Sequence, residues 1–201
     1  MPAVAVFCAS SEAIDERYSV LAAEVGFALA HRGWSLVSGG GAISSMGAVA
    51  RAARAGGAHT IGVIPQALVD MEVADHGSDE LIVTADMRER KGEMDRRADA
   101  FLALPGGIGT LEELLEVWAA RSLQMHSKPI VILDPWGDYQ GLRELFSTLS
   151  GGGFLRPDVQ AIAIWTSSTD EAMLAIEQAW AHEEQSTAQQ PTAAEFLEAE
   201  L

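Results

Sequence analysis

The sequence predicts a doubly wound α/β fold of the Rossmann-like kind, in which helices cover both faces of a mainly parallel sheet. Seven short apolar runs alternate with longer segments whose apolar residues recur at helical spacing. Because the runs are apolar on consecutive residues, both faces of each strand are expected to be buried, as in parallel sheets with right-handed crossovers. At 201 residues with 48% hydrophobic content, the chain fits one sizeable domain.

The expected strands are, in chain order, "AVAVFCA" from Ala3, "WSLVS" from Trp34, "HTIGVI" from His59, "ELIVT" from Glu80, "AFLAL" from Ala100, "PIVIL" from Pro129 and "AIAIW" from Ala161. The clearest helices span Ile14–His31, Met46–Ala55, Leu111–Arg121 and Thr169–Trp180. After residue 181 the composition changes to five acids, with no Lys or Arg and no strand pattern. Residues 1–181 are therefore the expected domain, and residues 182–201 an acidic tail expected to be disordered.

The charge and the cysteine content restrict the classes of partner. Thirteen Lys and Arg residues against 29 Asp and Glu residues give a net charge of -16, which repels phosphate backbones and anionic lipids. We therefore expect neither a nucleic acid nor a membrane as a partner. Cys8 is the single cysteine and is expected to pack at a buried strand end. Without a signal-peptide pattern or a membrane span, a cytoplasmic location is expected.

Two glycine-rich loops follow expected strands, where open parallel sheets bind their ligands. They are "SGGGAISSMG", residues Ser38–Gly47, and "PGGIGT", residues Pro105–Thr110. Glycine lets a ligand approach the backbone N–H groups, and the helix that follows adds unpaired donors and a positive dipole end. Either loop could hold a phosphate group. Neither is a dinucleotide fingerprint, because Ser44 replaces its last glycine, or a Walker loop, because no Lys follows Gly47 or Gly109.

Basic residues gather immediately before the second loop, in "MRERKGEMDRR". Five of the thirteen basic residues lie there: Arg88, Arg90, Lys91, Arg96 and Arg97. A solvated helix face with acidic partners would also explain them, and we expect two or three to be ordinary surface charges. The others are available to a bound phosphate.

Three carboxylates, Glu112, Glu113 and Glu116, open the helix after the second loop. Acids in a first turn complement the helix dipole, so a purely structural role is one explanation. The other is chemical, because a carboxylate near a bound phosphosugar could stabilise positive charge at the anomeric carbon or activate water there.

The motifs "MRERKGEM" and "PGGIGTLEE" together resemble the paired signatures of the LOG family, the cytokinin riboside 5'-monophosphate phosphoribohydrolases formerly labelled lysine decarboxylase-like. The resemblance covers about residues 3 to 180 and includes "GVIPQAL". It implies a homodimeric enzyme with a Rossmann-like fold and its active site near the subunit interface. The implied reaction is hydrolysis of the N-glycosidic bond of nucleoside 5'-monophosphates, AMP included, to free base and ribose 5-phosphate. It implies neither a metal nor an organic cofactor.

Position by position, the resemblance implies that Arg90 and Glu113 are the catalytic pair. It also implies that substrate is bound by Glu72, Lys91, Gly107, Ile108, Gly109, Thr110, Leu111 and Glu112. From the first glycine loop, we expect Gly40, Gly41 and Met46 to bind substrate as well. The chain departs from the family pattern in having Arg88 where many members have His and Ala119 where they have Thr. The first glycine loop also differs, with "SGGG" and "SSMG" in place of Y-G-G-G and G-L-M-G. These departures leave the preferred base open.

Two other classes of function stay open at this point, because a fold does not determine a function. One is a non-catalytic nucleotide-binding or sensing protein, which would hold AMP-like ligands and leave them intact. The other is a cofactor carrier of the kind that binds the molybdenum cofactor. Among enzymes, a general nucleotide nucleosidase without a cytokinin role is close to the leading interpretation.

Overall fold

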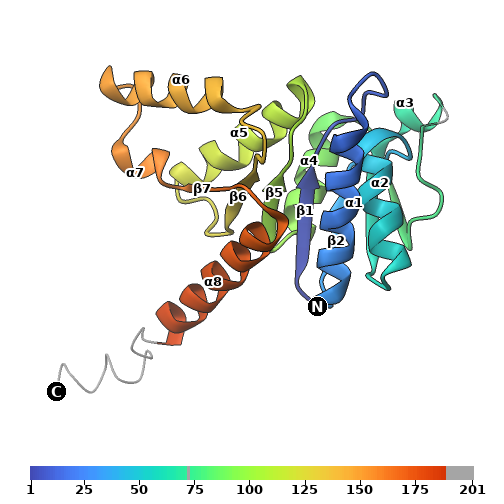
Figure 1. Ribbon diagram of the computed structural model, residues 1–201. Helices are drawn as coiled ribbons and strands as arrows, with labels where there is room; N and C mark the ends of the chain where they lie inside the picture. The colour runs from blue at the N-terminus through green and yellow to red at the C-terminus, as the bar shows by residue number, and fades with distance from the viewer. Residues whose placement is uncertain (72, 189–201) are drawn as a thin grey trace.

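The computed structural model describes residues 1–71 and 73–188, with side chains as far as residue 183. In this part of the chain, seven parallel strands form one sheet in the order β4-β3-β2-β1-β5-β6-β7. Figure 1 shows the part of this sheet from β2 through β1, β5 and β6 to β7. The strands are β1 (Ala3–Phe7), β2 (Ser35–Ser38), β3 (Thr60–Pro65), β4 (Glu80–Thr84), β5 (Ala100–Ala103), β6 (Ile130–Leu133) and β7 (Ala163–Thr166). Each of the seven apolar runs forms one strand, which confirms the predicted fold class.

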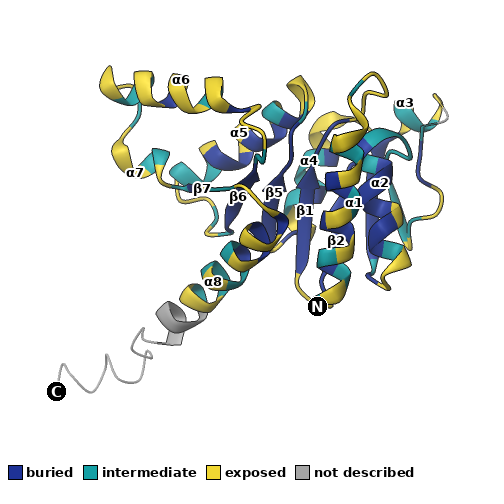
Figure 2. Cartoon of the chain, viewed as in Figure 1, coloured by how far each residue is buried: buried dark blue, intermediate teal, exposed yellow. Residues whose placement is uncertain are grey.

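Helices cover both faces of the sheet, so the core is divided into two layers. On one face lie α1 (Glu16–His31), α2 (Ser44–Ala55) and α8 (Thr169–Ala188). On the other face lie α4 (Met87–Arg97), α5 (Ile108–Ser122), α6 (Gln140–Gly151) and α7 (Pro157–Gln160). Leu29, Val49 and Met173 fill the first layer, and Met94 and Leu114 the second. Figure 2 shows buried strands between helices whose outward faces are exposed.

The strand order reverses at β1, which lies in the centre of the sheet. The chain forms β2, β3 and β4 on one side of β1, and β5, β6 and β7 on the other. Ala5 of β1 pairs with Val37 of β2 and with Phe101 of β5. Where the order reverses, the connections after neighbouring strands diverge to opposite faces and leave a crevice at the carboxyl ends of the strands. The topology therefore places a ligand site beyond the ends of β1 and β5.

The predicted helices are all present, although their ends differ. Helices α2 and α5 begin at Ser44 and Ile108, inside the two glycine-rich loops, and α8 continues to Ala188. Helix α8 therefore extends past the boundary at residue 181, because the Ala, Gln and Glu residues that follow are good helix formers. The remainder of the predicted tail, residues 189–201, lies outside the described residues. Among the described residues, no helix is long and apolar enough to span a membrane.

Candidate active site

A cavity of 720 Å³ lies at the crevice where the strand order reverses. Most of its wall is formed by the segments that follow the carboxyl ends of β1, β2, β3 and β5, and by the N-terminal turns of α4 and α5. Cys8–Ser11 follow β1, Gly39 and Gly41 follow β2, and the second glycine loop follows β5. Both glycine-rich loops therefore meet at one site, as their positions in the sequence predict.

Helix α4 brings Arg90 to this cavity. The carboxylate of Asp86 caps the helix by accepting from the N–H groups of Arg88 and Glu89, at 2.8 and 2.9 Å. The side chain of Glu89 accepts in turn from the N–H of Ala85 at 2.7 Å, in the manner of a capping box. These bonds fix the first turn of α4, from which Arg90 reaches the cavity wall with 4% of its surface exposed.

Arg90 forms a buried ion pair with Glu113, which α5 supplies. Nη1 of Arg90 donates to Oε1 of Glu113 at 2.6 Å, and Nε donates to the carbonyl of Val63 at 3.0 Å. Only 5% and 9% of the two side chains are exposed. Gly39 leaves room for the guanidinium, because a Cβ there would lie 2.0 Å from Nη2 of Arg90. The first glycine loop thus shapes the pocket that holds the pair.

The burial of this pair changes the acidity of the groups around it. Burial raises the pKa of Glu113 above its ordinary value, and the neighbouring charge of Arg90 acts in the opposite direction. A buried carboxyl group with a raised pKa in a cavity wall is a common feature of active sites. Burial also raises the pKa of the Cys8 thiol, which is 4% exposed. Cys8 packs in the core while lining the cavity, and as a protonated thiol it is a poor nucleophile.

The second glycine loop presents the start of α5 to the cavity. Gly107 is the N-cap residue, and no side chain among the described residues caps the helix. The N–H groups of the first turn are thus left to a ligand. Tyr139 supports the loop, because its hydroxyl donates to the carbonyl of Leu104 at 2.9 Å. Gly106 packs against Thr110 so closely that a Cβ would lie 2.2 Å from Oγ1. This arrangement is suited to binding a phosphate group.

Most of the residues predicted for the site line this cavity. They are Arg90, Glu113, Gly41, Met46, Gly107, Ile108, Gly109 and Thr110. Met46 also closes the first glycine loop, because its sulfur accepts from the N–H of Gly41 at 3.2 Å. The two motifs that are separate in the sequence therefore come together around one ion pair.

Other predicted residues do not line the cavity. Lys91 forms ion pairs with Glu112 and, at 2.8 Å, with Glu116, so its charge lies along the outside of α5. Leu111 packs against the core, and Gly40 turns the backbone with a φ of 71°. These residues, Lys91, Glu112, Leu111 and Gly40, are absent from the cavity wall formed by the described residues. Glu72 lies outside the described residues.

The remaining basic residues of α4 are surface charges. Arg88, Arg96 and Arg97 are exposed. Arg96 pairs with Glu93, while Arg97 pairs with Glu93 and with Glu80, each at 2.9 Å. Three of the five clustered charges thus match the expectation that two or three of them serve the surface.

Several residues of the cavity wall were not predicted from the sequence. Ser10 and Ser11 follow β1, and their position after the central strand of the sheet could have identified them. Tyr18 and Asp138 also line the cavity, and the hydroxyl of Tyr18 donates to Asp138 at 2.9 Å. No pattern in the sequence predicts that contact, because it joins residues 120 positions apart.

Comparison with known proteins connects this site to a family. A family model described as "Possible lysine decarboxylase" matches residues 46–176, which include Arg90 and Glu113. The cytokinin riboside 5'-monophosphate phosphoribohydrolase of Mycobacterium marinum is 51% identical over 172 residues, which are 86% of this chain and 91% of the relative. The LOG5 enzyme of Arabidopsis thaliana, with the same activity in its name, is 41% identical over 87% of this chain and 76% of its own. The chain belongs to the LOG family.

Solved structures extend the likeness of this LOG family member at the level of the fold. The molybdenum cofactor carrier protein of Chlamydomonas reinhardtii superposes with a TM-score of 0.68 at 24% identity, over 90% of this chain and 98% of that one. The molybdenum cofactor binding protein of Rippkaea orientalis gives a TM-score of 0.67 at 23% identity, over 88% of this chain and 96% of that one. At these identities the likeness concerns the fold alone.

Proposed function

We propose that this protein hydrolyses the N-glycosidic bond of cytokinin riboside 5'-monophosphates, and of AMP, to yield the free base and ribose 5-phosphate. The observation that carries the proposal is the buried Arg90–Glu113 ion pair in the cavity wall, beside the first turn of α5. The relatives that share most of the chain are named for this reaction.

In the proposed complex, the 5'-phosphate lies against the N–H groups at the start of α5. The donors there are those of Ile108, Gly109 and Thr110, strengthened by about half a positive charge from the helix dipole. Arg90 is the one basic side chain among the described residues that line the cavity, and its charge is paired with Glu113. Amides and hydroxyls, including those of Ser10 and Ser11, therefore bind the phosphate.

With the phosphate held there, the ribose lies near Glu113. As the bond from C1' to the base nitrogen breaks, positive charge develops on the sugar, and the carboxylate of Glu113 stabilises it. The same carboxylate orients the water whose oxygen forms the new bond to C1'. The proton that this water releases ends on the departing base, so the reaction needs no other reactant. Arg90 favours the ionised form of Glu113, against the effect of burial, and fixes the orientation of its carboxylate.

The test is to incubate the purified protein with AMP and with N6-isopentenyladenosine 5'-monophosphate and to measure the released base chromatographically. We expect release from at least one nucleotide, and a decrease in kcat of about 100-fold or more in Glu113→Gln, because a transition-state interaction is lost. Glu177→Gln is the matched control, since it removes a carboxylate that pairs with Arg32 on the opposite helix layer.

Two results would count against the proposal. If the protein binds these nucleotides and returns them intact, it is a non-catalytic nucleotide-binding protein. If Glu177→Gln and Glu113→Gln lower kcat equally, the carboxylate in the cavity has no chemical role. By contrast, if Glu113→Gln binds nucleotides fully but releases no base, Glu113 acts in the chemical step and not in binding.

We also propose that the protein acts in the cytoplasm as a homodimer. Two apolar side chains that line the cavity are exposed, Ile108 by 84% and Met87 by 47%, and Leu115 of α5 is 39% exposed. A second copy of the chain would cover them, and exposed apolar clusters commonly mark such interfaces. Light scattering should give about twice the chain mass of 21.4 kDa, whereas the mass of one chain would refute the dimer.

Cys8, the single cysteine, is buried and unpaired, which fits a reducing compartment.

A further inference from the structure

One side of the cavity is apolar and comes from the segment that joins β3 to β4. Leu68, Met71 and Val73 line the cavity there and form what we call the apolar wall. The polar groups of the site, Arg90, Glu113 and the start of α5, belong to other elements. If the polar groups hold the phosphate and ribose, the apolar wall is left for the base and any alkyl group on it.

Core packing does not hold the apolar wall in place. Of the described residues between Pro65 and Ala74, none is buried, and Met71 is 67% exposed. The short helix α3 (Gln66–Val69) contributes no side chain to the core. The position of the wall therefore depends on the two ends of the segment, where Pro65 belongs to β3 and Ala74 and Asp75 are buried.

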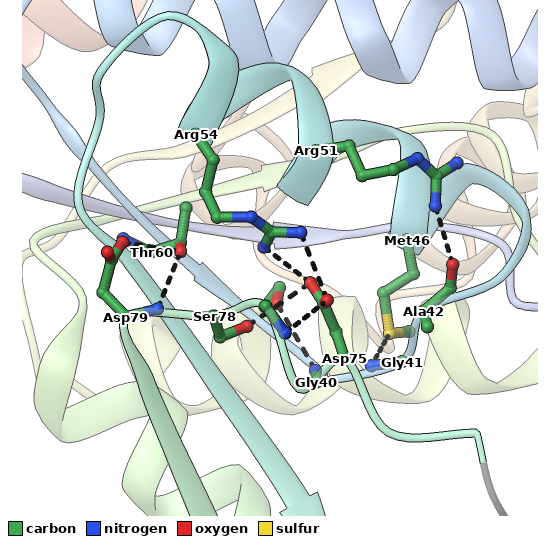
Figure 3. Close-up of polar contacts among 12 residues, drawn as sticks. Gly40, Gly41, Ala42, Met46, Arg51, Arg54, Thr60, Asp75, Ser78 and Asp79 are labelled. Carbon is green, nitrogen blue, oxygen red and sulfur yellow. Dashed lines mark hydrogen bonds and ion pairs between the residues drawn. The ribbon is translucent and has the colours of Figure 1, made fainter.

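The second of these ends is hydrogen-bonded to the first glycine loop, and Figure 3 shows Asp75 beside Gly40 of that loop. The N–H of Ala42 donates to the carbonyl of Val73 at 2.9 Å, and the N–H of Asp75 donates to the carbonyl of Gly40 at 2.7 Å. Gly41 and Ala74 thus form an isolated antiparallel bridge. One residue of the wall, Val73, is itself part of this connection.

An ion pair from α2 locks this connection. Nη1 and Nη2 of Arg54 donate to the two carboxylate oxygens of Asp75, at 2.7 and 3.2 Å, and Figure 3 shows the guanidinium facing the carboxylate. The side chains are 22% and 10% exposed, so water screens the pair only partly. Oδ1 of Asp75 also accepts from the N–H of Gly77 at 3.2 Å. A Cβ on Gly77 would lie 3.0 Å from Nη2 of Arg54, so glycine leaves room for the pair.

We infer that Arg54 and Asp75 are positioning residues that fix the apolar wall and thereby set the preference for N6-alkylated adenine over plain adenine. The inference rests on the proposed function. It assigns a role in substrate choice to a pair that neither lines the cavity nor contacts Arg90 or Glu113 among the described residues.

The test compares kcat/KM for N6-isopentenyladenosine 5'-monophosphate and for AMP in Asp75→Asn and in Arg54→Gln. The asparagine keeps a side-chain oxygen for Gly77 and removes the charge. We expect the ratio of the two values to fall about tenfold or more in either variant, because an apolar contact the size of a methylene group is worth about 10–200-fold. The kcat for AMP should change less than about twofold, since the catalytic pair is untouched.

Two further variants separate positioning from a general loss of stability. Arg32→Gln breaks the Arg32–Glu177 pair, 2.8 Å long, which joins α1 to α8 away from the cavity. It should leave the ratio unchanged, although it also breaks an ion pair between two segments of the chain. The exchanged pair, Arg54→Asp with Asp75→Arg, should recover part of the lost preference. An unchanged ratio in both single variants, or an equal fall in Arg32→Gln, would overturn the inference.

Amide hydrogen exchange tests the inference without catalysis. The N–H groups of Ala42 and Asp75 should lose protection in Asp75→Asn and keep it in Arg32→Gln. If the wild-type protein releases no base from either nucleotide, the proposed function fails while this measurement still decides whether the pair fixes the segment. Unchanged protection of both amides in Asp75→Asn would refute the positioning role whatever the activity.

Discussion

Replacing Arg90 by methionine would leave Glu113 buried without its cation. Removing one partner of a buried ion pair typically costs about 3–5 kcal/mol in the free energy of unfolding. Little discount for solvent is needed, because the two side chains are 5% and 9% exposed. Part of the loss, about 1–3 kcal/mol, would come from the carbonyl of Val63, which loses the donor Nε of Arg90. The total loss is a large share of the free energy of unfolding of a typical protein, which is about 5–15 kcal/mol.

The remaining part of this loss should depend on pH, with a sign fixed by the pKa of Glu113. Burial already raises that pKa above 4.5, and Arg90 lowers it, so the substitution raises it further. A carboxyl group whose pKa is raised by folding loses stability as pH rises from its unfolded pKa through its folded pKa. The deficit of Arg90→Met should therefore grow between about pH 4.5 and neutrality. For each further pH unit by which the substitution raises the pKa of Glu113, the stability deficit above that pKa grows by about 1.4 kcal/mol.

Urea unfolding followed by tryptophan fluorescence, at about pH 5 and about pH 8, measures this difference. The double variant Arg90→Met with Glu113→Gln should recover the pH-dependent part, because no charge is then left buried without a partner. Arg32→Gln serves as the control, since its partner Glu177 is 42% exposed. A deficit of equal size at both pH values, or a double variant as unstable as the sum of the single ones, would refute this account of the pair.

One glycine substitution should lower stability without changing substrate binding, and another should weaken substrate binding. A Cβ on Gly26 would lie 2.4 Å from a backbone oxygen of α2, so Gly26→Ala should lower the free energy of unfolding by about 1–3 kcal/mol and leave KM unchanged. If Gly26→Ala unfolds at a higher temperature than the wild-type protein, the close packing of Gly26 against α2 is contradicted. A Cβ on Gly106 would lie 2.7 Å from Cβ of Thr110, so Gly106→Ala should displace the loop and raise the KM for AMP by about 10–100-fold. An unchanged KM in steady-state assays would mean that the phosphate does not bind at this loop.

The strands and the principal helices could be predicted because local patterns determine them. All five residues of β1 are buried, which is why "AVAVF" is apolar on consecutive positions. Helix α6 was not among the predicted helices, although Leu142, Leu145, Phe146 and Leu149 recur at helical spacing. Phe146 is its one buried residue, and the segment around it contains Gly137, Gly141 and Gly151, which favour a loop interpretation.

The candidate site could be predicted only in part, because contacts between distant residues decide its geometry. Arg90 and Glu113 came from the family motifs, and their contact spans 23 positions. Lys91 follows Arg90 directly, yet successive residues of a helix point about 100° apart, so Lys91 pairs outside the cavity. The contact of Arg54 with Asp75 joins a helix to an irregular segment, and no periodic pattern in the sequence predicts such a contact.

The charge distribution gives the charged side chains and the uncharged N–H groups of the site different roles. A protein with a net charge of -16 slows the approach of an anionic nucleotide, although salt screens that field over about 8 Å at physiological ionic strength. Near the cavity, Arg90 is neutralised by Glu113, and Lys91 by Glu112 and Glu116. In the proposed complex, capture of the phosphate therefore falls to uncharged N–H groups and to the dipole of α5, both of which act at short range. This arrangement leaves Arg90 free of the phosphate, and its charge can serve the one carboxylate on which the proposed chemistry depends.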